Sequence, residues 1–420
     1  MRKGDDEEGV DSAKLVEIAA PQSLADIAAG RFVEGDSGVD ASTPPAWLGP
    51  TQRACYNRTR DVFEQHAFVY TMCFHVSLVI GFNLKPLLDA LVFTGDSATP
   101  TQALQRYMDT FAHLVDWHTG DVFDPTATAY KSVEDVRKIH AGVRGAMEAK
   151  GKKLAINQFN LAVVQSGFMG LSTVAPNQLG LVLKESQLSD YVFFWRCVGR
   201  QLGIDDRFNL CGGGKRSSDA IVQEVTEQML FPAVANPPAG FDKMAQAYID
   251  SLNSVWKGVP LLSVKSTMAV TYWALGKEDK APFELTLLDS ARFLNYRILF
   301  LLLGYCPLFE KTASALLLLV FRLRPPPPSA SACACPWTGR IIDSGQIQKR
   351  CPGAAVASEE ALREGRIDRQ TNSRRAGCAR LALLALVVGG VLCVWAMAVG
   401  LLVAFAVVVA ESALPRILVS

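Results

Sequence analysis

A single histidine, His140, lies between two arginines in the stretch "KSVEDVRKIHAGVRG" (131–145). Arg137 precedes it by three residues and Arg144 follows it by four, so on a helix the three side chains share one face. His140 also falls within an apolar stripe of that helix, which consists of Val133, Val136, Ile139, Val143 and Met147. An imidazole on an apolar face is usually a hydrogen-bonded core histidine. A neutral imidazole can also coordinate haem iron while guanidiniums bind haem propionates, and this helix alone leaves both interpretations open.

A second polar set occurs in "ALQRYMDTFAHLVDWHTGDVFDP" (103–125). The 4-3-4 spacing places on one helix face Arg106, Thr110, His113 and Trp117. Each polar group on a buried face needs a partner, so such a mixture is unusual for a core. The spacing alone does not distinguish a functional face from a solvated surface that includes one aromatic residue.

Two further segments, "NQFNLAVVQSGFMG" (157–170) and "DYVFFWRCVGRQLGIDDRFNLC" (190–211), indicate core helices whose glycines allow close packing. Neither pattern points to a function by itself. The stretch "GGGKRS" (212–217) departs from a phosphate-binding loop, which would need Gly where Asn209 stands and Ser or Thr where Arg216 stands. We therefore interpret it as a polar loop.

The chain has 420 residues, half of them hydrophobic, and a formal net charge of +1. This length allows a large domain with a substantial buried core. The near-zero charge and the lack of a basic run give no reason to expect a nucleic-acid partner. Ten dispersed cysteines do not suggest a disulfide framework, and Cys333, Cys335 and Cys351 lack the spacing of a zinc site. Free thiols in a reducing compartment are therefore expected.

Apolar periodicity between residues 46 and 290 predicts an all-α domain. Helices are expected near residues 51–80, 84–93, 100–117, 131–149, 157–171, 186–202, 218–230, 239–255 and 260–275. The run "AFVYTMCFHVSLVIGF" (67–82) is short for a membrane span and includes a histidine, so it predicts a buried core helix. Residues 1–45 are acidic and thin in large apolar side chains, which predicts a disordered or loosely attached stretch without a secretory signal.

The segments after the domain differ in composition. Residues 291–323 are apolar but carry Glu310 and Lys311 in their middle, so they predict membrane-proximal helices, interfacial or re-entrant, or a hydrophobic flap. Residues 324–380 are rich in Pro, Ser, Ala and Arg and predict a flexible linker. Residues 381–410 contain no charge and predict a transmembrane helix. The basic residues that precede this helix predict that the N-terminal domain faces the cytosol.

Four motifs, "RYMDT", "VRKIHAGVRG", "QSGFMG" and "FFWRCVGRQLGIDDRFN", occur in this order within residues 46–280. Their sequence and spacing resemble the catalytic domain shared by the ER-bound mpaB-type oxygenases and the rubber oxygenases (latex clearing proteins), most closely the metazoan branch. The resemblance implies an all-α, globin-like core that holds a b-type haem. It also implies oxygen-dependent cleavage of a carbon–carbon double bond in an isoprenoid chain.

The resemblance assigns roles to individual residues. His140 matches the proximal, axial ligand of the haem iron, and Arg137 matches an arginine that supports the haem. Arg106 and Thr110 match polar residues on the distal side. One position departs from the pattern, because rubber oxygenases have a lysine directly before this threonine and here the position is Asp109. Oxygen handling and substrate are therefore expected to differ.

Together these observations predict a haem b-dependent oxygenase anchored in a membrane, expected to be that of the endoplasmic reticulum. Arg144 is expected to join Arg137 in binding the propionates, while Arg106 and Thr110 form the catalytic oxygen site. The partners would be O2 and a hydrophobic small molecule delivered from the bilayer. Two alternatives remain. One is a haem-binding carrier or sensor, which Asp109 favours, and the other is a membrane-tethered helical scaffold in which His140 is a core residue.

Overall fold

The computed structural model describes residues 20–36, 39–255 and 260–323. Within these ranges the chain is helical, and its strand-like pairing is an isolated bridge between Glu34 and Asn157. The all-α prediction is therefore confirmed for this part of the chain. The predicted linker and transmembrane helix, residues 324–410, lie outside the described residues.

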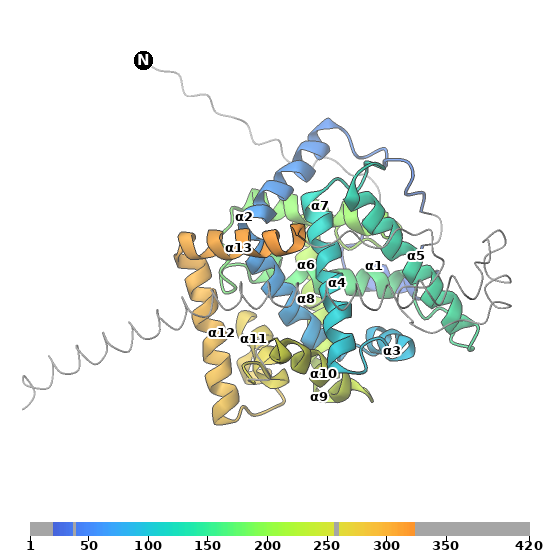
Figure 1. Cartoon of the computed structure of the whole chain (residues 1–420). Coiled ribbons are helices and arrows are strands. Elements are labelled where there is room, and N and C mark those ends of the chain that lie inside the picture. Colours follow the sequence, from blue (N-terminus) through green and yellow to red (C-terminus); the bar gives the residue numbers. More distant parts are fainter. Residues whose placement is uncertain (1–19, 37–38, 256–259, 324–420) are drawn as a thin grey trace, which may run out of the picture.

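Each helix predicted between residues 51 and 275 corresponds to an observed helix whose ends differ by about one turn or less. In chain order the elements are α1 (Leu24–Ala28), η2 (Ala29–Phe32), α2 (Pro50–Gly81), α3 (Lys85–Thr94), α4 (Pro100–Thr119), α5 (Thr128–Glu148), α6 (Gln158–Val174), α7 (Glu185–Gln201), α8 (Gly214–Val225), η3 (Thr226–Leu230), α9 (Phe231–Ala235), α10 (Phe241–Ser254), α11 (Val264–Ala274), η4 (Glu278–Lys280), α12 (Leu287–Tyr305) and α13 (Pro307–Arg322). Figure 1 shows how they pack into one bundle.

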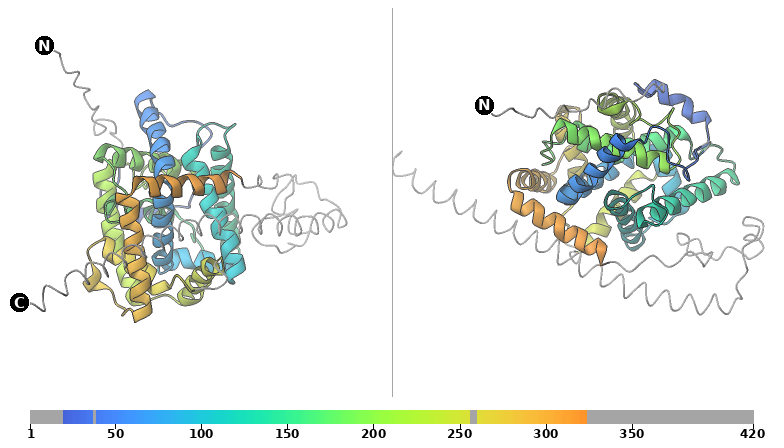
Figure 2. Two further views of the ribbon diagram at one scale, coloured as in Figure 1. Left: turned by 60° about the vertical axis from the view of Figure 1, so that its left-hand side comes forward. Right: turned by 90° about the horizontal axis from the view of Figure 1, so that it is seen from above.

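Helix α2 runs through the middle of this bundle (Figures 1 and 2). It packs against α4, α6, α7, α11 and α13, and most of its residues from Ala67 to Ile80 are buried. The helix bends at His66, where the backbone leaves helical geometry (φ −117°, ψ 20°). A helix that is apolar on every face suits a position with neighbours all round. The structure thus accounts for the apolar run 67–82 as a core helix.

Glycines allow α6 to approach its neighbours closely. A Cβ at Gly170 of α6 would lie 2.8 Å from Cγ1 of Val222 in α8. A Cβ at Gly199 of α7 would clash with the Gln165 side chain of α6. Because neither place has room for a larger residue, the close packing expected at these glycines is confirmed.

Residues 20–36 belong to the packed domain, although their composition predicts a loosely attached stretch. Helix α1 packs against α6 and α8 and buries Leu24 and Ile27. Ser23 caps this helix by accepting a hydrogen bond from the Asp26 backbone N–H. Val39 is buried as well. These apolar side chains are too sparse to stand out in the composition, and only the surface that receives them shows that the segment is held.

Helices α12 and α13 form a pair bent by 102° on one side of the domain (Figure 2). Helix α12 packs against α11, and α13 packs against α2. Among the described residues, no single helix combines the length and the apolar character needed to cross a membrane, whereas this bent pair and the pair of α2 with α3 have them jointly. Glu310 of α13 is buried and contacts His66 at the bend of α2.

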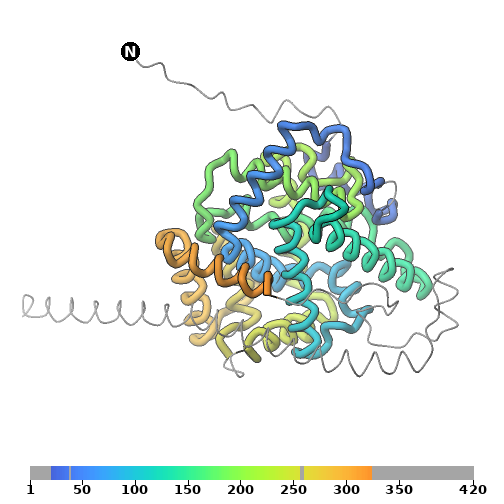
Figure 3. Tube along the Cα trace, turned by 45° about the horizontal axis from the view of Figure 1, so that its top comes forward, coloured from blue at the N-terminus to red at the C-terminus, as the bar shows by residue number. Residues whose placement is uncertain are grey.

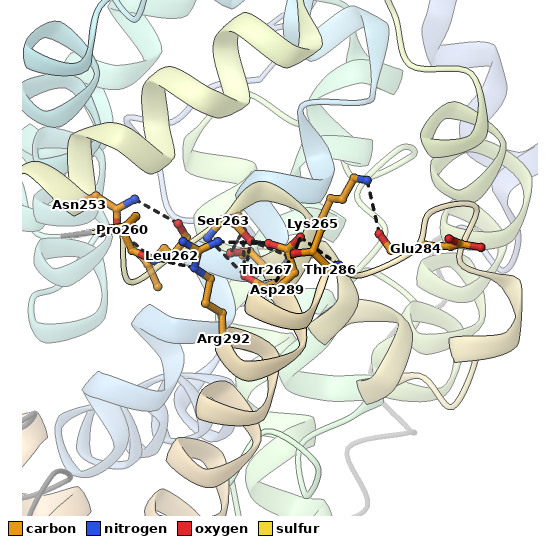
Figure 4. A network of polar contacts seen from close by, with 11 residues as sticks. Asn253, Pro260, Leu262, Ser263, Lys265, Thr267, Glu284, Thr286, Asp289 and Arg292 are labelled. Carbon is orange, nitrogen blue, oxygen red and sulfur yellow. Dashed lines mark hydrogen bonds and ion pairs between the residues drawn. The ribbon is translucent and has the colours of Figure 1, made fainter. Parts of the chain in front are cut away.

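A polar network holds the start of α12 (Figure 4). The Asp289 carboxylate accepts hydrogen bonds from the hydroxyls of Ser263 and Thr286, each at 2.7 Å, and pairs with Arg292 at 3.3 Å. Burial acts to raise the pKa of Asp289, but these donors outweigh it and hold the pKa below its usual value. Arg292 also donates to the Pro260 carbonyl at 2.9 Å. Charge-assisted hydrogen bonds therefore fix α12 to the segment that precedes α11.

Candidate cofactor site between α4 and α5

Helices α4 and α5 pack against each other and are joined by a short connection (Figure 1). Ser132 of α5 accepts a hydrogen bond from Trp117 Nε1 at 3.0 Å, and its hydroxyl lies 2.7 Å from His113 Nδ1. Trp117 and Ser132 are both buried. This half of the polar stripe on α4 therefore holds α4 to α5.

His140 stands on α5 and is half-buried. Its Nδ1 atom is buried and has no hydrogen-bond partner among the described residues. Burial lowers the pKa of His140 to about 4, with further lowering by the guanidiniums of Arg106 and Arg144, while the Asp36 carboxylate opposes the shift. The imidazole is therefore neutral at pH 7 and can offer a lone pair.

Arg106 of α4 lies close enough to His140 for its charge to act on the imidazole. Its Nη1 donates a hydrogen bond to Thr94 Oγ1 of α3 at 2.9 Å. Burial lowers the pKa of Arg106, but a guanidinium remains charged at neutral pH. Thr110, one turn further along α4, donates its hydroxyl hydrogen to the Arg106 carbonyl at 3.1 Å. Its oxygen retains acceptor lone pairs.

The inner face of α5 is covered at its ends but not in its middle. Val133 and Met147, at the two ends of the apolar stripe, are each 2% exposed. The stripe between them is half-buried at Val136, Ile139, His140 and Val143. The described residues thus leave part of this face accessible next to His140.

The two arginines beside His140 bind the N-terminal segment. Arg137 forms an ion pair with Asp36 and donates to the Val39 carbonyl at 2.5 Å. Arg144 donates to the Gly35 carbonyl. Figure 3 shows this blue segment beside α5. Both guanidiniums therefore have oxygen acceptors from the chain itself, one of them a carboxylate.

Asp36 is the residue of this site that the sequence does not reveal. It lies 101 residues before Arg137, in a stretch whose composition suggests loose attachment. Its backbone is left-handed (φ 72°), a conformation that Asp tolerates better than most residues. The structure gathers the charges of Arg106, Arg144 and Asp36 around His140. By contrast, the hydrogen bonds described for Arg137 and Thr110 go to groups other than the imidazole.

Acid is expected to destabilise the fold through buried histidines. Burial lowers the pKa of His75 to about 4 and, against a hydrogen bond to the Leu114 carbonyl, that of His118 to about 3. With His140, these groups stay neutral in the fold while an unfolded chain protonates them below a pKa of about 6.5. The free energy of unfolding should therefore reach its full value above pH ~6.5. It should fall as the pH approaches 4, by up to ~1.4 kcal/mol per pH unit for each histidine.

Denaturant unfolding between pH 8 and pH 4.5 measures this dependence. The variant His118→Phe keeps an aromatic ring between Phe63 and Phe194, whose ring centroids lie 4.1 and 4.5 Å from that of His118. This variant lacks one of the three histidines, so its free energy of unfolding should change less steeply with pH, by the contribution of one proton. It serves as the control. A free energy of unfolding that stays constant down to pH 5 would contradict burial of these groups as neutral imidazoles.

Comparison with known proteins identifies one family. Residues 66–303 match the model of the family described as "ER-bound oxygenase mpaB/B'/Rubber oxygenase, catalytic domain", which is more than half of the chain. The matched range includes α4, α5 and their connection. No curated protein and no solved structure matches the chain. No cluster of three or more His, Cys, Asp or Glu side chains suited to a metal ion occurs among the described residues.

Proposed function

Because the chain belongs to the ER-bound oxygenase mpaB/rubber oxygenase catalytic-domain family, we propose that it is a haem b-dependent oxygenase. The proposed reaction uses O2 to cleave a carbon–carbon double bond in a hydrophobic, isoprenoid-like molecule. Family membership supports oxygenase chemistry, while the b-type haem and the isoprenoid-like substrate are carried over from the resemblance of the sequence motifs. The observation that carries the haem is His140, a neutral imidazole whose buried nitrogen has no hydrogen-bond partner in the described part of the chain.

The surroundings of His140 fit a haem held by one protein ligand. A haem would need one imidazole from the chain, and His140 would supply it. Leaving a buried nitrogen unpaired costs ~1–3 kcal/mol, which a bond to a ligand would offset. The accessible positions of the apolar stripe beside His140 are Val136, Ile139 and Val143, and an apolar wall of this kind would suit a porphyrin. These features together favour a bound cofactor over a packed core.

Arg137 and Arg144 are proposed to bind the haem carboxylates. Both guanidiniums already bind oxygen acceptors, namely the Asp36 carboxylate and the carbonyls of Val39 and Gly35. A carboxylate of the cofactor would take the same kind of charge-assisted hydrogen bond. Asp36 is the acceptor that such binding would displace, since two carboxylates compete there for one guanidinium.

Arg106 and Thr110 are proposed to shape the side of the site where oxygen reacts. When bound, the haem supplies the iron and the redox chemistry, and the chain supplies charge, orientation and access. Arg106 contributes a fixed positive charge, which its hydrogen bond to Thr94 keeps in place. Thr110 contributes a hydroxyl oxygen that can still accept a hydrogen bond. Preorganised groups of this kind act more strongly in a shielded site than in water.

A membrane location is proposed together with this substrate class. The uncharged segment 381–410 would anchor the chain, expected in the endoplasmic reticulum, and Arg374, Arg375 and Arg380 would keep the N-terminal domain in the cytosol. Protease added to intact membranes should then digest the domain. A domain that is protected until the membrane is opened would contradict this orientation.

The absorption spectrum of the purified full-length protein tests the proposed cofactor, and oxygen consumption with an unsaturated isoprenoid tests the reaction. A haem Soret band followed by substrate-dependent oxygen uptake and carbonyl products is the expected result. If no Soret band appears after expression with added haem precursor, the proposed cofactor is wrong. The membrane-tethered helical scaffold, in which His140 is a core residue, then becomes the preferred interpretation.

A haem carrier or sensor is the second candidate. Asp109, which stands where rubber oxygenases have lysine, accepts a hydrogen bond from Gln105 of the same helix at 2.8 Å. A carboxylate here gives the site a different charge from that of the rubber oxygenases. A protein that is fully loaded with haem but consumes no oxygen with any unsaturated isoprenoid would favour the carrier. The variant Asp109→Lys then shows whether this position determines activity.

A further inference from the structure

Helix α12 exposes a row of leucines. Leu287, Leu294 and Leu301 are 90%, 53% and 58% exposed, and their spacing of seven residues places them on one face. At the rise of an α-helix, this row extends over roughly 21 Å. Tyr305, 82% exposed, continues the same face at the end of the helix. A water-exposed helix normally carries charged residues on such a face.

The exposed sides of α12 and α13 are mostly apolar, and the exposed charged residues on them are the basic Arg297, Lys311 and Arg322. On α12 the face consists of Leu287, Ser290, Ala291, Leu294, Ile298, Leu301, Leu302 and Tyr305. On α13 it consists of Leu308, Thr312, Ala315, Leu319 and Leu323, with Leu308 77% and Leu323 62% exposed. We call the two together the α12–α13 face. Exposed large apolar side chains in such number are typical of an interaction site rather than of ordinary protein surface.

Packing holds this face outward. The opposite side of α12 buries Phe300 and Leu303, and that of α13 buries Phe309 and Leu317. The hydrogen bonds around Asp289 fix the start of α12 (Figure 4). Because one side of each helix is committed to the core, neither helix can be surrounded by lipid, and only the outer side is free to meet an apolar medium.

The exposed charged residues that α12 and α13 themselves contribute are basic. Arg297, Lys311 and Arg322 are exposed and lie on or beside the face, whereas the acidic Glu310 is buried against His66. Arg322 lies 3.3 Å from Glu64 in an exposed ion pair, which contributes little stability by itself. Apolar helices bordered by Lys and Arg suit the interface of a bilayer with anionic headgroups.

We propose that the α12–α13 face lies in the interfacial layer of a lipid bilayer. A second copy of the chain is the less favoured occupant, because two such faces would bring their basic borders together. This inference rests on the proposed function, because it names the source of the proposed hydrophobic substrate. The substrate would enter the domain from the membrane rather than from water.

Site-specific photocrosslinking in vesicles tests this proposal. Full-length protein carries benzoylphenylalanine in place of Leu294 or, as a matched control, in place of Val92 of α3, which has the same exposed fraction of 53%. Helix α3 lies on the other side of the domain from α12 (Figures 1 and 3). The protein is reconstituted in vesicles of phosphatidylcholine with a minor share of phosphatidylserine, and adducts are identified by mass spectrometry.

Lipid adducts at position 294 and few or none at position 92 are expected. The further substitution Leu301→Glu should lower the lipid yield at position 294 by about tenfold or more, since a carboxylate opposes insertion. Equal yields at the two positions would overturn the proposal. Adducts at position 294 to a second copy, or to a peptide from residues 381–410, would also overturn it. The crosslinking needs no cofactor, so a protein without haem that still gives these lipid adducts would refute the proposed function alone.

Discussion

Purified His140→Ala should lose its haem Soret band while retaining the helical circular dichroism of the unaltered protein. His140 supplies the neutral imidazole of the site, and among the described residues no multi-ligand cluster suited to a metal replaces it. Removing an outer-shell partner of a metal ligand already costs about 10–100-fold in affinity, so loss of the ligand itself should weaken haem binding by at least that factor. Haem titration followed by absorption measures the change.

Rescue and control variants separate ligation from a general structural effect. In His140→Gly, added imidazole should restore the Soret band, because the free base can occupy the space of the missing side chain. The control His113→Gln changes a histidine of α4 whose hydrogen bond goes to Ser132, and it should keep the haem. An unchanged Soret band in His140→Ala would remove His140 as the axial ligand and with it the main support for the proposed cofactor.

Gly180→Ala should destabilise the domain by ~2–5 kcal/mol. A Cβ at this position would lie 2.5 Å from the Phe300 carbonyl oxygen of α12 and 3.0 Å from the Gly304 amide nitrogen. The neighbouring atoms are backbone and cannot rotate away. The glycine also has a left-handed backbone (φ 74°), which costs ~1–2 kcal/mol for a residue with a side chain. The remainder comes from overpacking between the loop and α12.

Gly214→Ala provides the matched control for this prediction. Gly214 has nearly the same backbone angle (φ 78°), but a Cβ there would meet no atom within 4 Å. Its free-energy cost should therefore contain the backbone contribution alone. Urea unfolding of both variants, compared with the unaltered protein, gives the difference. Equal losses in the two variants would contradict the close approach of the loop to α12.

The helices and the apolar character of the core could be predicted from the sequence. Apolar periodicity is a local property, so α2, α4 and α5 could be predicted within about one turn of their observed ends. The same holds for the glycines of α6 and α7, whose small size is useful only where helices approach closely. The spacing of Arg137 and Arg144 around His140 follows from the helix alone.

The surroundings of these residues depend on how the helices pack. The tertiary structure placed Arg106 of α4 near His140, left the middle of the α5 face accessible, and brought Asp36 to Arg137 from a stretch that looks loosely attached. It also showed that the apolar helices α12 and α13 each bury one side and expose the other. Periodicity reports which side of a helix is apolar, but the partner that covers that side depends on contacts between residues far apart in the chain. Such contacts leave no regular pattern in the sequence, and for that reason the surroundings of His140 could be read only from the folded chain.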